Sequence, residues 1–338
     1  MILSTHVLFH QQIRGFRKVS SLCSRFTRDS LRERLRRQGI KQPNKSQVLR
    51  PPHADDTIPV RPVSHLLKAL GFTFGVGATA FTIAAVTECH RTENPFHFSG
   101  FSFDSRTGLP MADFSRFPST KQKWWEQLTD GDRCALYLVC ANLAIFALWK
   151  IKKLDKIMWR YFSNSFASKS LCLPMALSVF SHQSFIHLAL NMYVVWSFTN
   201  VSVNNFLGPN QFWALYLTGG VVSSFVSLAH KAIARSPSRA LGASGAILAL
   251  LGYTCMKIPE ARLKIVFVPG FDFSAQSAII SVLLFDLVGM LLRFRLFDHA
   301  AHIGGVLFGM GYAMAVDDMR WNNYLNQVSS VYRRMTGG

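Results

Sequence analysis

A stretch without a single charged side chain, residues 170–230, is the feature that most limits what this chain can fold into. It holds no Asp, Glu, Lys or Arg over 61 residues, and most of its residues are apolar. A helix needs about 20 apolar residues to cross a bilayer core about 30 Å thick. The stretch is therefore long enough for two membrane-spanning helices, and Gly208-Pro209-Asn210 marks the expected turn between them.

The composition of the whole chain fits the same class. Hydrophobic residues make up 49% of 338 residues, and the mean hydropathy is +0.19. Seven apolar runs are candidate spans: 69–87, 134–149, 183–204, 211–230, 241–256, 273–292 and 299–316. We predict an all-α polytopic membrane protein in which one additional N-terminal helix precedes a six-helix core (1+6).

Charge and proline content divide the chain further. Residues 1–50 hold 12 Lys/Arg against two acids, and five prolines between positions 43 and 62 indicate an extended linker. We expect these segments: a presequence and disordered tail over 1–65, the extra transmembrane helix over 66–88, a loop over 89–133, the core over 134–317, and a C-terminal tail over 318–338.

The first 28 residues are basic, rich in serine and free of acids. This composition is typical of a mitochondrial presequence, and the membrane protein that follows favours this interpretation. The alternative is a basic tail that binds anionic lipid or nucleic acid. We predict a multi-pass protein of the mitochondrial inner membrane, surrounded by lipid bilayer and without a nucleic-acid partner.

Loop charge predicts the orientation in the membrane. The tail before the first run, loop 150–169 and loop 231–240 are basic, whereas loop 88–133 is close to neutral. Because basic loops stay on the side from which a membrane protein inserts, the amino terminus is expected in the matrix and the carboxyl terminus in the intermembrane space. The start of the run at 241–256 then faces the matrix.

Ser244 is the candidate nucleophile. It lies in Gly242-Ala243-Ser244-Gly245, at the start of a 16-residue uncharged run that spans only about 24 Å as a helix. We therefore expect this helix to begin below the membrane surface, with Ser244 in its first turn. The free N–H groups of a helix start favour a developing oxyanion. The alternative is that these small residues only pack against a neighbouring helix.

His302 is the candidate general base, because an imidazole takes up a proton near neutral pH and activates a serine hydroxyl. It lies on nearly the same helical face as Gly305 and Gly309, whose spacing lets this helix approach a partner closely. If that partner is the Ser244 helix, the imidazole reaches the hydroxyl.

Two further ionisable residues compete for a role at the same place. His299 borders Asp298 at the membrane edge, where an exposed pair is expected, so His302 is the favoured base. Asp286 lies within an apolar run. It is a candidate third member that orients His302, but we favour a hydrogen bond elsewhere within the helix bundle.

Polar residues also cluster within the apolar run at 183–204 and just before it. His187 and Asn191 are four residues apart and share a helical face, close to His182. Buried in lipid without partners they would cost several kcal/mol, so we expect them to line a wet cavity, as peptide hydrolysis requires. Both donate hydrogen bonds that are able to stabilise an oxyanion. The alternative is an interhelical hydrogen-bond network.

These three pieces, in this order, resemble the rhomboid intramembrane serine protease family. The resemblance rests on His187-x-x-x-Asn191, on Gly242-Ala243-Ser244-Gly245, and on Ala301-His302-x-x-Gly305-x-x-x-Gly309. It implies Ser244 as nucleophile and His302 as general base in a dyad without an aspartate. It also implies an oxyanion hole formed by the backbone N–H of Ser244 with His187 and Asn191, single-span membrane proteins as substrates, and no metal or organic cofactor.

Two other function classes stay open at this point. A rhomboid-like pseudoprotease would bind membrane segments without cutting them, although such a protein has no need to retain Ser244 and His302. A small helical transporter would use the polar residues to line a path, with Asp286 as its best support, but no inverted repeat is visible. The sequence leaves the oligomeric state open.

Overall fold

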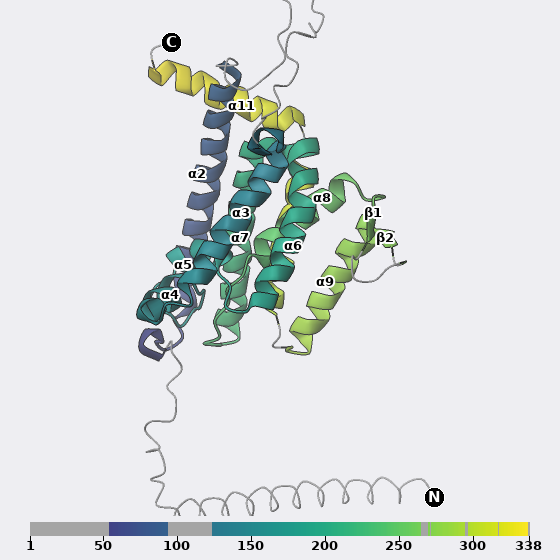
Figure 1. Cartoon of the computed structure of the whole chain (residues 1–338). Helices are drawn as coiled ribbons and strands as arrows, with labels where there is room; N and C mark the ends of the chain where they lie inside the picture. Colours follow the sequence, from purple (N-terminus) through teal and green to yellow (C-terminus); the bar gives the residue numbers. More distant parts are fainter. Residues whose placement is uncertain are drawn as a thin grey trace, which may run out of the picture. The chain divides into compact units, whose positions relative to one another are not determined.

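Long apolar helices make up most of the structure (Figure 1). The computed structural model describes residues 54–93, 124–264, 270, 272–294, 297–316 and 318–336. The predicted presequence and most of the predicted loop 89–133 lie outside these residues. Residues 54–65 of the predicted disordered tail are instead folded, with short helical turns over Ala54–Asp56 and Val63–His65. Residues from position 52 onward belong to one compact unit.

A helix occupies each apolar run that the sequence marks. The long helices are α2 (Leu66–Glu93), α3 (Asp130–Leu148), α6 (Phe185–Ser202), α7 (Gly208–Ile233), α8 (Ser244–Lys257), α9 (Ala275–Leu291), α10 (His299–Ala315) and α11 (Asp318–Thr336). Among the described residues, three helical stretches are long and apolar enough to cross a membrane: Val63–Arg91, Asp130–Leu148 and Phe185–Ile233. The helix α9 is apolar but shorter.

Short elements join the long helices. They are η2 (Ala54–Asp56), η3 (Val63–His65), η5 (Trp124–Gln127), η6 (Lys152–Leu154), α4 (Asp155–Tyr161), α5 (Leu173–Leu177), η7 (Ser178–Phe180) and the π-helical turn η8 (Val203–Leu207). Two antiparallel strands, β1 (Arg262–Lys264) and β2 (Asp272–Ser274), pair Leu263 with Phe273 between α8 and α9. The predicted turn between the two long spans is present at Gly208, whose φ of 64° suits glycine, and Pro209 follows in the first turn of α7.

The helix α7 lies at the centre of the packing. Phe212, Leu215 and Tyr216 on it are fully buried, and it contacts α2, α3, α8 and α10. The additional helix α2 packs along α7, where Gly77 lies against Thr218. The helix α2 is therefore attached to the bundle through its contact with α7.

The sequence predicts residues 318–338 as a tail, whereas the structure forms α11 over most of this segment. Figure 1 shows α11 across the carboxyl end of α2. Trp321 packs edge-on against Phe81, and the hydroxyls of Tyr324 and Thr82 are 3.2 Å apart. The signal for this helix is a set of apolar residues at helical spacing within a polar segment, which a search for apolar runs does not find.

The helices α8 and α10 cross at very short range. A Cβ atom added to Gly305 would overlap the carbonyl oxygen of Gly245, and one added to Gly309 would overlap that of Ala249. The prediction that the glycines at 305 and 309 admit a partner helix is confirmed, and the partner is α8. This crossing brings the first turns of the two helices together.

Gly309→Ala is therefore expected to destabilise the protein, because the new methyl group has no space between the two backbones. We expect a cost of about 1–3 kcal/mol, as for other overpacked sites. Thermal unfolding in detergent measures this effect. Gly311→Ala is the matched control, because nothing lies within 4 Å of a Cβ atom added there. Equal melting temperatures for the two variants would show that the close crossing does not stabilise the fold.

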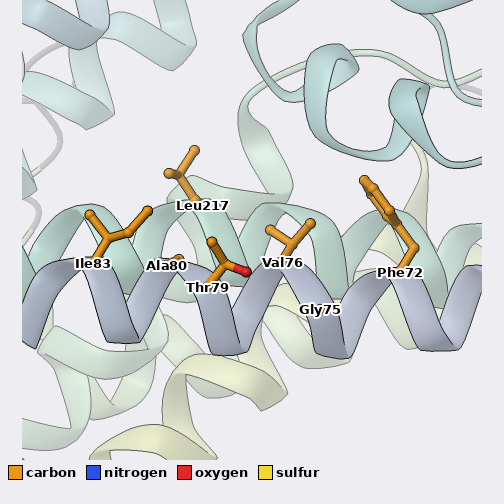
Figure 2. Close-up of a pocket in the computed structure, with 7 residues that line it drawn as sticks. All are labelled: Phe72, Gly75, Val76, Thr79, Ala80, Ile83 and Leu217. Carbon is orange, nitrogen blue, oxygen red and sulfur yellow. The ribbon is translucent and has the colours of Figure 1, made fainter. Parts of the chain in front are cut away.

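An apolar groove runs along the outside of α2, with a volume of about 360 Å³. Figure 2 shows its lining on α2, from Phe72 at one end to Ile83 at the other, with Leu217 of α7 beside them. Thr79 is the one hydroxyl-bearing residue among those that line it. None of the residues that line the groove has a side chain able to act as a general base.

Candidate active site

Ser244 is the first residue of α8, as the sequence predicts, and it is partly buried. The chain enters this helix through Gly242, whose φ of 138° is a conformation that suits glycine. A Cβ atom at Gly242 would lie 2.9 Å from Cε1 of His187. The N–H of Gly242 donates to the carbonyl oxygen of Ser178 over 3.0 Å. These contacts fix the path of the chain immediately before the serine hydroxyl.

His302 lies in the first turn of α10 and faces Ser244. Its Nε2 atom is 2.9 Å from Oγ of Ser244, which is hydrogen-bond distance. The start of α10 is held by Asp298, whose carboxylate accepts from the N–H of Ala301 over 3.2 Å. The close crossing of α8 and α10 thus places an imidazole nitrogen against a serine hydroxyl, the arrangement in which a base activates a nucleophile.

Asp286 on α9 completes a chain of hydrogen bonds through His302. Its Oδ1 atom is 3.1 Å from Nδ1 of His302 and 2.7 Å from Nδ1 of His299, and the residue is 1% exposed. An Nδ1–H that donates to a carboxylate leaves Nε2 of His302 free to accept the proton of Ser244. The site therefore includes an aspartate that the resemblance leaves out and that we expected to bond elsewhere. The connection between α9 and α10 is short, and Asp286 lies next to His302 where the two helices pack together.

The expectation for His299 is wrong. The residue is 4% exposed and bonds Asp286, not Asp298. Asp298 instead accepts from Nζ of Lys231 over 2.6 Å and from the hydroxyl of Ser227 over 2.6 Å. The physical reason is that Asp298 caps α10 and turns toward α7, whereas His299 turns into α9, where Gly289 leaves room for its ring.

The histidines at the start of α6 lie against the segment that carries Ser244. His182 is fully buried, and its Nε2 atom accepts from the N–H of Ala243 over 3.4 Å. The rings of His182 and His187 are 4.9 Å apart. Asn191 lies one turn further along α6, and its amide donates to the carbonyl oxygen of His187 over 2.8 Å. The structure thus brings His187 to Gly242, while the amide of Asn191 is engaged within its own helix.

A small cavity that Ser244 helps to line has a volume of about 30 Å³. Its lining includes the hydroxyls of Ser178, Ser223, Ser224 and Ser227. A volume of this size, with several polar partners, is enough for an ordered water molecule. Two contributors to the site, Ser178 and the serines of α7, carry no catalytic pattern in the sequence. Within the described part of the chain, no group of three or more His, Cys, Asp or Glu is placed to hold a metal ion.

Comparison with known proteins identifies the family to which these residues belong. The family described as "Rhomboid domain" matches residues 158–317. Presenilin-associated rhomboid-like protein, mitochondrial, of Bos taurus is 39% identical over 318 residues, which cover 93% of this chain and 82% of the relative. Its counterpart in Homo sapiens is 42% identical over 264 residues, which cover 78% of this chain and 69% of the relative.

The chain belongs to the rhomboid family. Rhomboid protein 1, mitochondrial, of Saccharomyces cerevisiae is also similar, with 34% identity over 191 residues, or 54% of each chain. The rhomboid match spans the segment that carries Ser244, Asp286 and His302. Together with the apolar helices, these relatives place the protein among mitochondrial membrane proteins. Rhomboid proteins include intramembrane serine proteases and also pseudoproteases, so activity depends on the site itself.

Proposed function

We propose that this protein is an intramembrane serine protease of the mitochondrial inner membrane, and that it cuts single-span membrane proteins within or beside their membrane segment. The observation that carries the proposal is the 2.9 Å contact between Oγ of Ser244 and Nε2 of His302 at the start of two crossing apolar helices. The contact supports catalysis because a hydroxyl held against an imidazole is an arrangement for proton transfer.

The reaction follows from this contact. The hydroxyl proton passes to Nε2 of His302 while Oγ of Ser244 bonds to the carbonyl carbon of the substrate. The resulting imidazolium is held by Asp286, and it gives the proton to the leaving amine as the peptide bond breaks. Water then loses a proton to the same nitrogen and attacks the acyl carbon. The imidazolium returns this proton to Oγ as the ester bond breaks, which releases the acid product and restores the Ser244 hydroxyl. The Ser244–His302 dyad implied by the resemblance thus gains an orienting carboxylate.

The oxyanion of the tetrahedral intermediate needs hydrogen-bond donors. The backbone N–H of Ser244 is free at the start of α8, and His187 lies beside Gly242. Asn191 is the third proposed donor, and its amide must exchange its bond to the carbonyl of His187 for one to the oxyanion. Each such donor contributes about 3 kcal/mol in serine proteases.

Asn191→Ala is expected to lower kcat about 100-fold with little change in KM, because the lost donor acts mainly on the intermediate. Cleavage rates at several substrate concentrations measure both constants. Asn200→Ala is a control on the same helix, because the amide of Asn200 bonds Asp132 and lies about two and a half turns away. A variant at position 191 with unchanged kcat would remove this residue from the oxyanion hole.

We further propose that the chain crosses the membrane in the 1+6 arrangement. The extra span is the part of α2 over the segment 66–88, and the core over 134–317 contains most of α3 and all of α6 to α10. The basic loops 150–169 and 231–240 lie on the side of the bundle where α2 begins, which supports an amino terminus and an active-site opening on the matrix side. The segments 1–65, 89–133 and 318–338 would then lie outside the bilayer core.

The transporter alternative loses its best support. Asp286 was its main candidate residue, and that carboxylate is hydrogen-bonded to two histidines beside Ser244. The pseudoprotease alternative is distinguished by product analysis. Protein reconstituted in liposomes with a single-span substrate is expected to release two fragments, and mass spectrometry is expected to place the cut within or just beside the membrane segment. Capture of the substrate without any cut would favour a pseudoprotease.

Helix-breaking residues near the cut should raise the rate, because a helical segment must unwind before its peptide bond is accessible. Substrates with and without a Gly-Pro pair in the segment test this point. A cut confined to the soluble part of the substrate, whatever the membrane segment, would overturn the proposed substrate class.

A further inference from the structure

The segment before α2 is tied to the loop that follows α4. Thr57 and Ser168 form an antiparallel bridge, and the N–H of Ile58 donates to the carbonyl oxygen of Ala167 over 2.8 Å. The guanidinium group of Arg61 donates to the carbonyl oxygens of Ser168 and Lys169, each over 2.9 Å. Figure 1 shows α4 and α5 at the end of the bundle where α2 begins. The segment before α2 is therefore fixed in place at this end of the bundle.

Asp56 is the centre of this attachment, and its side chain is 5% exposed. The carboxylate accepts from Nε of Arg160 over 2.9 Å, from Nη2 of Arg239 over 3.0 Å and from the hydroxyl of Ser168 over 2.6 Å. A buried carboxylate is tolerated only when charged and polar donors surround it. Arg160 lies on α4, Ser168 on the loop after it, and Arg239 on the loop before α8. Asp56 therefore joins the segment before α2 to α4 and to both loops.

The carboxylate of Asp56 stays ionised near neutral pH. Burial raises the pKa of Asp56, but the hydrogen bonds from Ser168, Arg160 and Arg239 together lower it below its ordinary value of 3.8. Because the pKa in the folded protein is lowered, the stability contributed by the ionised carboxylate is present above about pH 4 and is lost as the pH falls through the lowered pKa.

Arg239 connects the cluster to the chain that carries the nucleophile. Its side chain is 6% exposed, and Nη1 donates to the carbonyl oxygen of Trp159 over 2.7 Å and to the hydroxyl of Ser163 over 2.9 Å. The next residue, Ala240, exchanges two backbone hydrogen bonds with Asn164, of 2.7 and 2.8 Å. Four residues later the chain reaches Ser244, after the bond between Gly242 and Ser178.

We propose that Asp56 is a positioning residue for the nucleophile, because it holds Arg239 and thereby the path of residues 239–243 into Ser244. This inference rests on the proposed function of Ser244. Without the carboxylate, the guanidinium group of Arg239 is left buried without its anionic partner. The loop then relaxes toward water, and the hydroxyl of Ser244 moves relative to His302. The segment before α2 thus acts on catalysis without touching the substrate.

The test is Asp56→Asn in the full chain, since asparagine keeps the shape of the side chain and removes its charge. We expect kcat to fall about 10- to 100-fold while KM changes by less than about twofold, because a small misplacement of a reacting group acts on the chemical step. Asp55→Asn is the matched control. Asp55 is 64% exposed and faces Lys156 at 3.5 Å, so its variant should stay within about twofold of the parent.

Ser168→Ala is a milder variant, which removes one neutral donor to Asp56 and leaves both arginines in place. We expect it to lower kcat about threefold, in the same direction. Hydrogen exchange followed by mass spectrometry gives a readout that does not depend on cleavage. The amide of Ala240 should exchange faster in both variants, while the amides of α8 should keep their protection.

Full kcat in a folded Asp56→Asn variant would overturn the proposal. A lower kcat with unchanged hydrogen exchange at Ala240 would also overturn it. The same holds if the loss of kcat is fully explained by the fraction of unfolded protein. The exchange result also separates this inference from the proposed function. If Ser244 proved dispensable for cleavage, the proposed function would fail, and a faster exchange at Ala240 would still show that Asp56 holds the loop.

Discussion

Ser244→Ala is expected to reduce the cleavage of a reconstituted single-span substrate by at least about 10⁴-fold, and His302→Ala is expected to do the same. Alanine at 244 removes the atom that bonds to the carbonyl carbon. Alanine at 302 leaves the hydroxyl protonated, so it stays a weak nucleophile. Because Oγ and Nε2 share one proton over 2.9 Å, the two groups act as a unit, and the double variant should be no slower than either single variant.

Initial rates in proteoliposomes measure these effects. Ser281→Ala and His230→Ala are matched controls, because both residues are exposed and lie outside the site. They should retain the parent rate. Cleavage by Ser244→Ala at more than about a hundredth of the parent rate would remove Ser244 as the nucleophile, since background catalysis in serine proteases is far weaker than that. A double variant far slower than both single variants would show that the two residues act separately.

Asp286→Asn is expected to lower kcat about 10³-fold while KM stays nearly constant. An asparagine amide offers an N–H where the carboxylate offered an acceptor, so it favours the His302 tautomer whose Nε2 carries the proton. That tautomer is unable to accept from Ser244. The loss of the negative charge also removes the partner of the imidazolium that forms during the reaction. The effect should therefore appear in the chemical step and not in substrate binding.

Kinetics at several substrate concentrations separate these constants for the variant at position 286. Asp272→Asn is the control, because Asp272 is an exposed acid on β2. His299→Phe adds a second comparison, since His299 shares the same carboxylate oxygen but does not touch Ser244. We expect its kcat to fall much less than that of Asp286→Asn. If Asp286→Asn kept a kcat close to that of the parent, Asp286 would have no catalytic role. The site would then be the Ser244–His302 dyad that the resemblance implies.

The helices and the contact between Ser244 and His302 could be predicted because each leaves a local signal. Uncharged runs mark the helices, and the glycine at 242 with the short run that follows marks a helix that begins at Ser244. The glycines at 305 and 309 mark a close helix crossing. These signals depend on residues within a few turns of one another, so the sequence alone contains them.

The contacts of Asp286 and His299 could not be predicted, because they depend on how far α9 and α10 slide past each other. A shift of one residue would turn either side chain away. The same holds for Asp56, whose partners lie more than a hundred residues away at Arg160 and Arg239. Such buried ion pairs leave no local signal in the sequence. An acid within a predicted linker is expected to be exposed, as most acids in linkers are.

Covalent labelling with a fluorophosphonate tests the central claim most directly. The full protein in lipid is treated with the probe, and mass spectrometry locates the modified residue. We predict an adduct on Oγ of Ser244, no adduct in Ser244→Ala, and a rate of labelling strongly reduced in His302→Ala. An adduct on a different serine, or labelling of Ser244 that is as fast without His302 as with it, would contradict the proposed site.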